Sequence, residues 1–180
     1  MSTAVCTPSA AEVHTLVLLR HAKSGYPDGV DDHDRPLTAR GEHEAPLAGR
    51  LLGALLAAEP GDGGGVGAGV DLVLVSSARR AQQTWKLAAG GVGAVRQAQT
   101  RAELYLASAD ELLGIVHDLP EAAATVIVVG HNDGLELLGT ALSATAVRLK
   151  TSTYAVLQSP LPWSQWTAGG VDLVDVVVAR

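Results

Sequence analysis

The stretch TLVLLRH, residues 15–21, indicates how the chain folds. Its first five residues form a short apolar run, which is too short for a helix and rich enough in β-formers for a strand buried on both faces. The run ends abruptly at Arg20 and His21. Two later runs repeat this pattern: VDLVLV at 70–75, followed by Ser76-Ser77, and TVIVV at 125–129, followed by Gly130-His131-Asn132. We therefore expect three buried strands with polar groups at their C-terminal ends.

Helical periodicity alternates with these strands. Three segments have apolar residues at helical spacing: 47–58, 78–89 and 110–119. Strand-helix alternation predicts an α/β fold, with a mostly parallel sheet covered by helices on both faces. Pro46 is tolerated in a first turn but not in a helix interior, so the first helix should begin near residues 41–46 or kink there. Two further β-like runs, at 154–157 and 171–178, complete a sheet of five or six strands.

The length of 180 residues and the 47% share of apolar residues fit one domain with one core. We expect this domain to span residues 14–180, after a flexible tail at 1–13. The glycine-rich stretch 60–69 indicates a flexible surface connection. It precedes a strand and lacks the GxGxxG spacing, which argues against a dinucleotide-binding loop.

Charge and cysteine content exclude several functional classes. Thirteen basic and nineteen acidic side chains give a net charge of −6, the wrong sign for a broad patch that binds nucleic acid. The single cysteine, Cys6, cannot form an internal disulfide and belongs to no zinc-binding cluster. No apolar run approaches the ~18 residues that a membrane span needs. We therefore expect a soluble, cytoplasmic protein without a nucleic-acid partner or a membrane.

Polar residues at the strand ends suggest a binding site, because ligands of open α/β sheets bind beyond the carboxyl ends of the strands. The sequence places Arg20, His21, Arg80 and His131 there. Ser77 is a plausible N-cap for the helix that carries Arg80, and Asn132 or Asp133 for the helix after His131. Guanidinium groups and helix N-termini suit phosphate, and a neutral imidazole can attack phosphorus. These residues predict covalent phosphoryl-transfer chemistry.

Five blocks of sequence carry a family resemblance: RHAKS (20–24), DRPLTARG (34–41), SSARRAQQT (76–84), AELY (102–105) and GHND (130–133). In this order they resemble the histidine phosphatase superfamily, and within it the short SixA-like phosphohistidine phosphatases. The likeness extends from residue 15 to about residue 158. It implies a phosphoglycerate mutase-like fold, a three-layer α/β/α sandwich around the sheet.

The resemblance also implies roles for single residues. His21 matches the nucleophile that becomes phosphorylated. Arg20 and Arg80 match the arginines that bind phosphate, and His131 matches the second histidine that contacts the transferring group. No metal ion or other cofactor is implied.

Other positions receive weaker assignments from the resemblance. Glu103 stands where larger relatives place an acidic proton donor, although the role is less defined in the short branch. Ser24 and Ser77 are candidates for hydrogen bonds to phosphate, Ser77 equally for a helix cap. Asp133 replaces the proline that many relatives have there, and brings negative charge toward an anionic substrate. The acidic stretch 31–34 lacks the spacing of a calcium or zinc site, so we interpret it as a solvated loop.

The predicted function is that of a metal-independent phosphatase that forms a phosphohistidine intermediate on His21 and acts on phosphohistidine in proteins. The first alternative is a phosphatase for small phosphomonoesters of the same superfamily. The second alternative is a non-catalytic phosphate-binding module, which predicts damage to the nucleophile, whereas His21 and its three partners are all present.

Overall fold

The computed structural model describes residues 13–58 and 69–179, which are built around a six-stranded sheet of order β3-β2-β4-β1-β5-β6. The strands β1 to β4 are mutually parallel, β5 runs antiparallel to β1, and β6 runs antiparallel to β5. The strands are β1 (His14–Arg20), β2 (Val70–Ser76), β3 (Val95–Arg101), β4 (Thr125–Gly130), β5 (Thr153–Ser159) and β6 (Asp172–Val178). The prediction of a mostly parallel sheet is confirmed.

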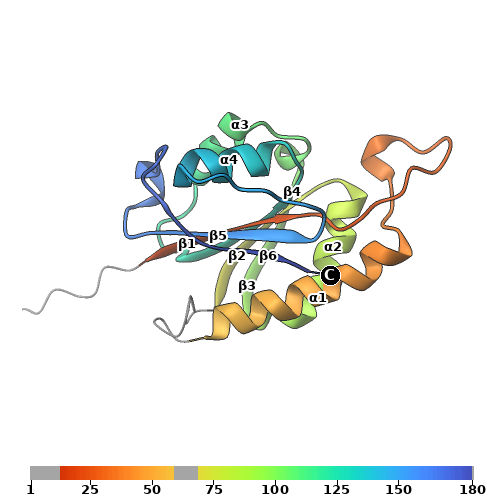
Figure 1. Ribbon diagram of the computed structural model, residues 1–180, viewed down its shortest axis with the longest axis horizontal. Helices are drawn as coiled ribbons and strands as arrows, with labels where there is room; N and C mark the ends of the chain where they lie inside the picture. Colours follow the sequence, from red (N-terminus) through yellow and green to blue (C-terminus); the bar gives the residue numbers. More distant parts are fainter. Residues whose placement is uncertain (1–12, 59–68, 180) are drawn as a thin grey trace, which may run out of the picture.

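Helices cover both faces of this sheet (Figure 1). On one face lie α1 (Ala39–Ala57) and α2 (Arg79–Val92), and on the other lie α3 (Ala109–His117) and α4 (Gly134–Ser143). Three short 3-10 helices join these elements: η1 (Asp32–Asp34), η2 (Ala102–Leu104) and η3 (Trp163–Gln165). The expected three-layer α/β/α sandwich is therefore present.

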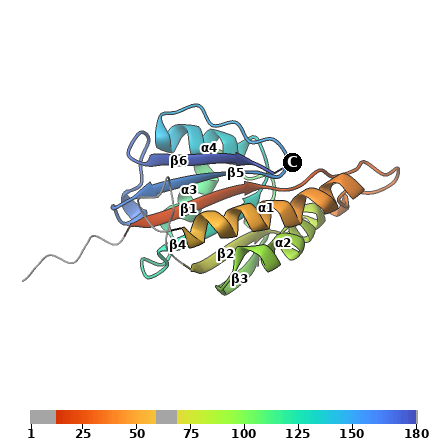
Figure 2. The same ribbon diagram turned by 60° about the horizontal axis from the view of Figure 1, so that its bottom comes forward.

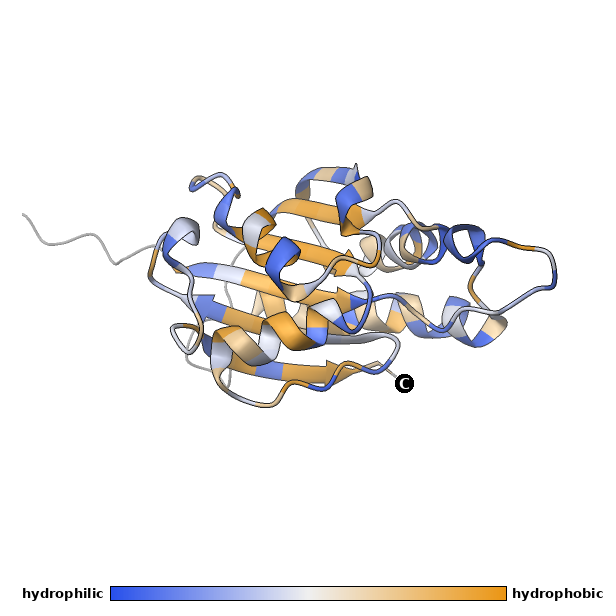
Figure 3. Cartoon of the chain, turned by 90° about the horizontal axis from the view of Figure 1, so that it is seen from above, coloured by the Kyte–Doolittle hydropathy of each residue, from blue (hydrophilic) through white to orange (hydrophobic). Residues whose placement is uncertain are grey.

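The central strand β1 shows why its sequence is continuously apolar. Leu16 and Leu18 pack into the core beneath α3 and α4, while Val17 and Leu19 pack into the core beneath α1 and α2. All four side chains are buried. Alternate residues point to opposite faces of a strand, so a strand between two helical layers needs apolar residues at every position. Figure 3 shows the resulting apolar band along the central strands.

The start of α1 is fixed by contacts with the loop that follows β1. The Thr38 side chain accepts a hydrogen bond from the Gly41 amide at 3.2 Å, and the Thr38 amide donates to the carbonyl oxygen of Lys23 at 2.9 Å. A Cβ atom on Gly41 would overlap that same carbonyl oxygen. Because this cap sets the boundary, the helix begins at Ala39. Pro46 lies inside the helix, so of the two expected arrangements, the one that places it in the first turn is wrong.

The edge strand β3 has no counterpart among the segments predicted from the sequence. Its residues, VRQAQTR, are half-buried or exposed, and among the strands that the structure describes it pairs only with β2. A strand at the edge of a sheet needs little apolar surface, so hydropathy does not reveal it.

The helices α1 and α2 lie side by side across their face of the sheet (Figure 2). Cβ atoms on Gly49 and Gly91 would each overlap backbone atoms of the other helix. This close contact holds α2 against α1, and α2 carries Arg80 at its N-terminal end.

Two expected segments, the tail at 1–13 and the connection at 60–69, fall almost entirely outside the described residues. Within the described ranges, no helix combines the length and the apolar character that crossing a bilayer requires.

Candidate active site

The carboxyl ends of β1, β2 and β4 meet at one edge of the sheet. Arg20 in β1 pairs with Gly130 in β4, and Val75 in β2 pairs with Val129. The His21 amide then donates to the Gly130 carbonyl oxygen at 3.1 Å. Parallel register therefore brings the residues that follow these strands together.

A cavity of about 250 Å³ opens at this edge. Four cationic side chains face it from different segments, and Asp32 is its one carboxylate among the described lining residues. Its polar lining comes from Arg20, His21, Lys23, Ser24, Asp32, Arg35, Arg80, His131, Asn132 and Thr151. The cavity is thus suited to an anion although the chain as a whole is acidic.

His21 lies in the cavity wall with its tautomer fixed by two hydrogen bonds. Its Nδ1–H donates to the Ala22 carbonyl oxygen at 2.8 Å, while its Nε2 accepts from Arg80 Nε at 3.2 Å. An arginine nitrogen only donates, so Nε2 must carry the free lone pair. Burial, helped by the charge of Arg80, lowers the pKa of His21 to about 4. The imidazole is therefore neutral near pH 7, and its Nε2 carries the free lone pair that a nucleophile needs.

His131 lies beside His21, with a distance of 5.1 Å between the two ring centroids. Its Nδ1 accepts a hydrogen bond from Arg80 Nη2 at 3.2 Å, and its Nε2 lies 2.8 Å from the hydroxyl of Ser76, the last residue of β2. Because Nδ1 is an acceptor here, Nε2 is the protonated nitrogen that donates to Ser76. Burial lowers the pKa of His131 to about 3, and the charge of Arg80 adds to this effect.

Arg20 enters the site from the end of β1. Its Nη1 donates to the Leu149 carbonyl oxygen at 2.8 Å, while its buried Nε has no hydrogen-bond partner among the described residues. Burial also lowers the pKa of this guanidinium from its ordinary value, although an arginine remains charged under all ordinary conditions. Ser24, buried in the same wall, supplies a hydroxyl group.

The structure does not bring Glu103 and Ser77 into the cavity lining. Glu103 is exposed, forms an ion pair with Arg101 at 2.5 Å, and borders a neighbouring depression. The prediction that Ser77 caps α2 is wrong, because Ala78 occupies the N-cap position. The Ser77 hydroxyl instead lies 3.0 Å from His33 Nε2. The catalytic role of Glu103 and the phosphate contact of Ser77 stay predictions.

Asp133, which replaces the proline frequent in relatives, does not line the cavity. Asp133 is the N-cap of α4, and it is one of the two residues expected there. Its side chain makes no capping hydrogen bond, while its backbone carbonyl oxygen accepts from the Leu137 amide.

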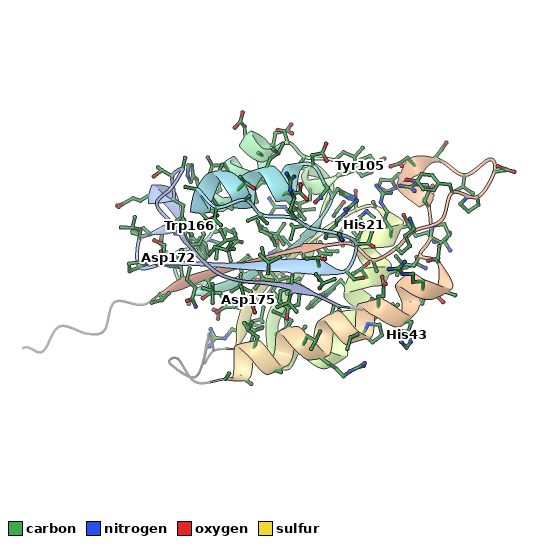
Figure 4. The ribbon with its side chains drawn as sticks, viewed as in Figure 1. His21, His43, Tyr105, Trp166, Asp172 and Asp175 are labelled. Atoms are coloured by element: carbon green, nitrogen blue, oxygen red, sulfur yellow. The ribbon has the colours of Figure 1, made fainter. Side chains whose placement is uncertain are left out.

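The interpretation of residues 31–34 as a solvated loop is incomplete: residues 32–34 form η1, and the half-exposed side chain of Asp32 is also part of a hydrogen-bond network. Its carboxylate receives hydrogen bonds from Arg80, Arg35 and Tyr105. The spacing of Asp32 and Arg35, three residues apart, is the signal that predicts part of this network. Figure 4 shows Tyr105 at the same end of the sheet as His21, far from Trp166. Among the residues that the structure describes, no group of three or more His, Cys, Asp or Glu could hold a metal ion.

No model of a protein family matches the chain. An uncharacterized protein of Mycobacterium tuberculosis is 38% identical over 173 residues, covering 90% of this chain and 100% of that protein. An uncharacterized chloroplastic protein of Arabidopsis thaliana is 30% identical over 164 residues, covering 85% of this chain and 70% of that protein.

Solved structures give a consistent likeness. The candidate phosphohistidine phosphatase SixA of Nakamurella multipartitia is 32% identical, with a TM-score of 0.78 and coverage of 96% of this chain and 99% of that chain. A candidate SixA of Agrobacterium tumefaciens is 25% identical, with a TM-score of 0.72 and coverage of 92% and 97%. A protein histidine phosphatase SixA complexed with tungstate shares the fold, at 22% identity, a TM-score of 0.73 and coverage of 92% and 97%.

Proposed function

The chain belongs to the histidine phosphatase superfamily and resembles SixA proteins in structure, and we propose that it removes phosphate from phosphohistidine in proteins through a phosphorylated His21. The observation that carries this proposal is the neutral His21, whose Nε2 faces Arg80 in a cationic cavity while its Nδ1 is tied to a backbone carbonyl. No metal ion has a part in the proposed reaction. We place the reaction in the cytoplasm, whose reducing conditions suit a chain with one cysteine.

In the first step, the lone pair of His21 Nε2 attacks phosphorus, and the bond from phosphorus to the substrate nitrogen breaks. The electron pair leaves with the substrate imidazole, which departs as a neutral ring when its other nitrogen already carries a proton. Arg20 and Arg80 neutralise the charge on the equatorial oxygens of the phosphoryl group. The hydrogen bond from His21 to the Ala22 carbonyl stabilises the positive charge that develops on the attacking ring.

In the second step, water attacks the phosphorus of phospho-His21. The bond between phosphorus and Nε2 breaks, its electron pair returns to Nε2, and the proton of the water passes to phosphate or solvent. The enzyme is then restored, and inorganic phosphate is the product. His131, whose ring lies beside that of His21, is next to the phosphoryl group in this scheme.

The choice of phosphohistidine follows from the leaving group. Asp32 is the one carboxylate in the described cavity lining, and its hydrogen bond with Tyr105 lowers its pKa, as do the charges of Arg80 and Arg35. An ionised carboxylate cannot protonate an alkoxide, whereas a protonated imidazole leaves without help. At the cavity mouth, the exposed side chains of Tyr26 and Leu106 offer apolar surface to a flat ring.

The proposal is tested by measuring initial rates on a phosphohistidine protein, a phosphohistidine peptide, phosphoramidate, and alkyl and aryl phosphomonoesters. We expect the highest kcat/KM on phosphohistidine and the lowest on alkyl phosphomonoesters. Samples quenched in alkali during turnover should contain an acid-labile phosphate that maps to His21. His21→Asn should abolish both turnover and labelling, whereas His43→Asn, on the exposed surface of α1, should change neither.

Two results would overturn the proposal. Substantial turnover by His21→Asn would rule out His21 as the nucleophile. A kcat/KM on an alkyl phosphomonoester above that on phosphohistidine would assign the chain to small phosphorylated molecules instead.

A further inference from the structure

We propose that Asp32 is a positioning residue for Arg80: it holds the outer end of the guanidinium so that the inner edge stays turned toward the phosphoryl group. This inference rests on the proposed function, because it concerns the same phosphate site. It assigns a role to η1, the segment that the sequence presents only as an acidic loop.

The hydrogen bonds of Arg80 divide between two sides of its planar group. On the inner edge, Nε donates to His21 at 3.2 Å and Nη2 donates to His131 at 3.2 Å. At the outer end, Nη1 donates to the Asp32 backbone carbonyl at 2.6 Å, and the second hydrogen of Nη2 faces the Asp32 carboxylate at 3.1 Å. The guanidinium fork is rigid, so fixing its outer end also fixes the direction of its inner edge.

This arrangement prepares the inner edge for a substrate. A phosphoryl group between His21 and His131 would replace the two histidine nitrogens as acceptor of the Nε and Nη2 hydrogens. Arg80 would not need to release Asp32 for this exchange. A donor that is already oriented costs no reorganisation when charge develops in the transition state.

Asp32 is itself held from two further directions. Arg35 Nε donates to its Oδ1 at 2.9 Å, and the Tyr105 hydroxyl donates to its Oδ2 at 2.6 Å. The Arg80 side chain is only 2% exposed, whereas that of Asp32 is 48% exposed. The carboxylate therefore links the buried guanidinium of Arg80 to the side chains of Arg35 and Tyr105.

In Asp32→Ala, Nη1 of Arg80 keeps the backbone carbonyl of residue 32, but the outer hydrogen of Nη2 loses its carboxylate acceptor in a buried position. An unpaired buried donor is costly, so the guanidinium would rotate to seek other partners. Misplacement of a phosphate-binding group by ~1 Å can lower the rate by about 10²-fold. We therefore expect Asp32→Ala to reduce kcat by between about tenfold and 10²-fold while Arg80 is present.

A double-mutant cycle tests whether the effect runs through Arg80. The four proteins are the wild type, Asp32→Ala, Arg80→Ala and the double variant, assayed on phosphoramidate or phosphohistidine peptide. In the Arg80→Ala background, Asp32→Ala should change the rate by less than about twofold, because no guanidinium is left to orient. Asp32→Asn keeps one carbonyl acceptor and should recover part of the lost rate. Asp34→Ala, in the same turn but outside the cavity lining, is the matched control and should stay within about twofold of wild type.

Titration with inorganic phosphate gives a second readout that does not depend on turnover. Asp32→Ala should weaken phosphate binding when Arg80 is present and leave it unchanged when Arg80 is absent. Equal losses in both backgrounds would overturn the proposal, since Asp32 would then act through the fold in general. Tighter phosphate binding by Asp32→Ala would also overturn it, because the carboxylate would be a competitor for Arg80. If the wild type binds phosphate but turns over none of the substrates, the proposed function fails while the Asp32 test still stands.

Discussion

Replacing His21 with asparagine should make the protein less sensitive to acid. In the folded chain, burial lowers the pKa of His21 to about 4, from an ordinary value of 6.5. Between these two values the unfolded chain binds a proton that the folded chain does not, so the stability of the wild type falls as the pH is lowered through this window. Asparagine cannot bind that proton.

The size of the effect follows from the two pKa values. Between about pH 7 and pH 4.5, this one imidazole costs the folded state about 2 kcal/mol. His131 has a depressed pKa for the same reason, and part of that depression comes from its repulsion with His21. Its contribution therefore also shrinks when His21 is removed. His21→Asn should consequently lose less stability on acidification than the wild type, by at least about 2 kcal/mol.

The assay is denaturant unfolding of both proteins at a series of pH values, with the free energy of unfolding plotted against pH. Contributions from all other groups cancel to first order in the difference between the two curves. His43→Asn, on the exposed surface of α1, controls for the loss of a histidine as such. Parallel curves for wild type and His21→Asn would refute the argument that His21 is held neutral by burial.

Three further outcomes are expected. Glu103→Gln should change kcat by less than about threefold on both phosphohistidine and an alkyl phosphomonoester, because Glu103 lies outside the cavity lining. A loss of about 10²-fold or more on the monoester alone would instead identify Glu103 as the proton donor. Gly41→Ala should lower the free energy of unfolding by about 1–3 kcal/mol in denaturant titrations, because the new Cβ would overlap the Lys23 carbonyl. The control Gly90→Ala should be neutral or stabilising, because among the described residues its new Cβ meets no atom of a neighbouring segment within 4 Å. Turnover should survive EDTA, since arginine side chains meet the transition-state charge; loss on chelation that one metal ion restores would contradict this mechanism.

The central strands were predictable because their burial requires a local run of apolar residues. β1, β2 and β4 are covered on both faces and therefore need apolar residues at consecutive positions. The edge strand β3 has no such requirement, and its polar sequence gives no signal. The position of β3 depends on its backbone pairing with β2, and the hydropathy of its own residues does not reveal that pairing.

The neighbourhood of Arg20, His21 and His131 was predictable for a geometric reason. Each residue lies at or just after the end of a buried strand, and parallel strands in register end at the same edge of a sheet. The start of α1 was not predictable from helix propensity, because it depends on a hydrogen bond from the Thr38 amide to the Lys23 carbonyl oxygen. Lys23 lies in the loop that follows β1.

By itself, the sequence determined the α/β class, the strands that form the centre of the sheet, and the residues at their carboxyl ends, since all of these follow from periodicity along the chain. Only the tertiary structure decided which loop residues join them. It brings Asp32 and Tyr105 to Arg80, and leaves Glu103 paired with Arg101 outside the cavity lining. The reason is that loops are positioned by individual hydrogen bonds and ion pairs with distant residues, and such contacts leave no periodic pattern in the sequence.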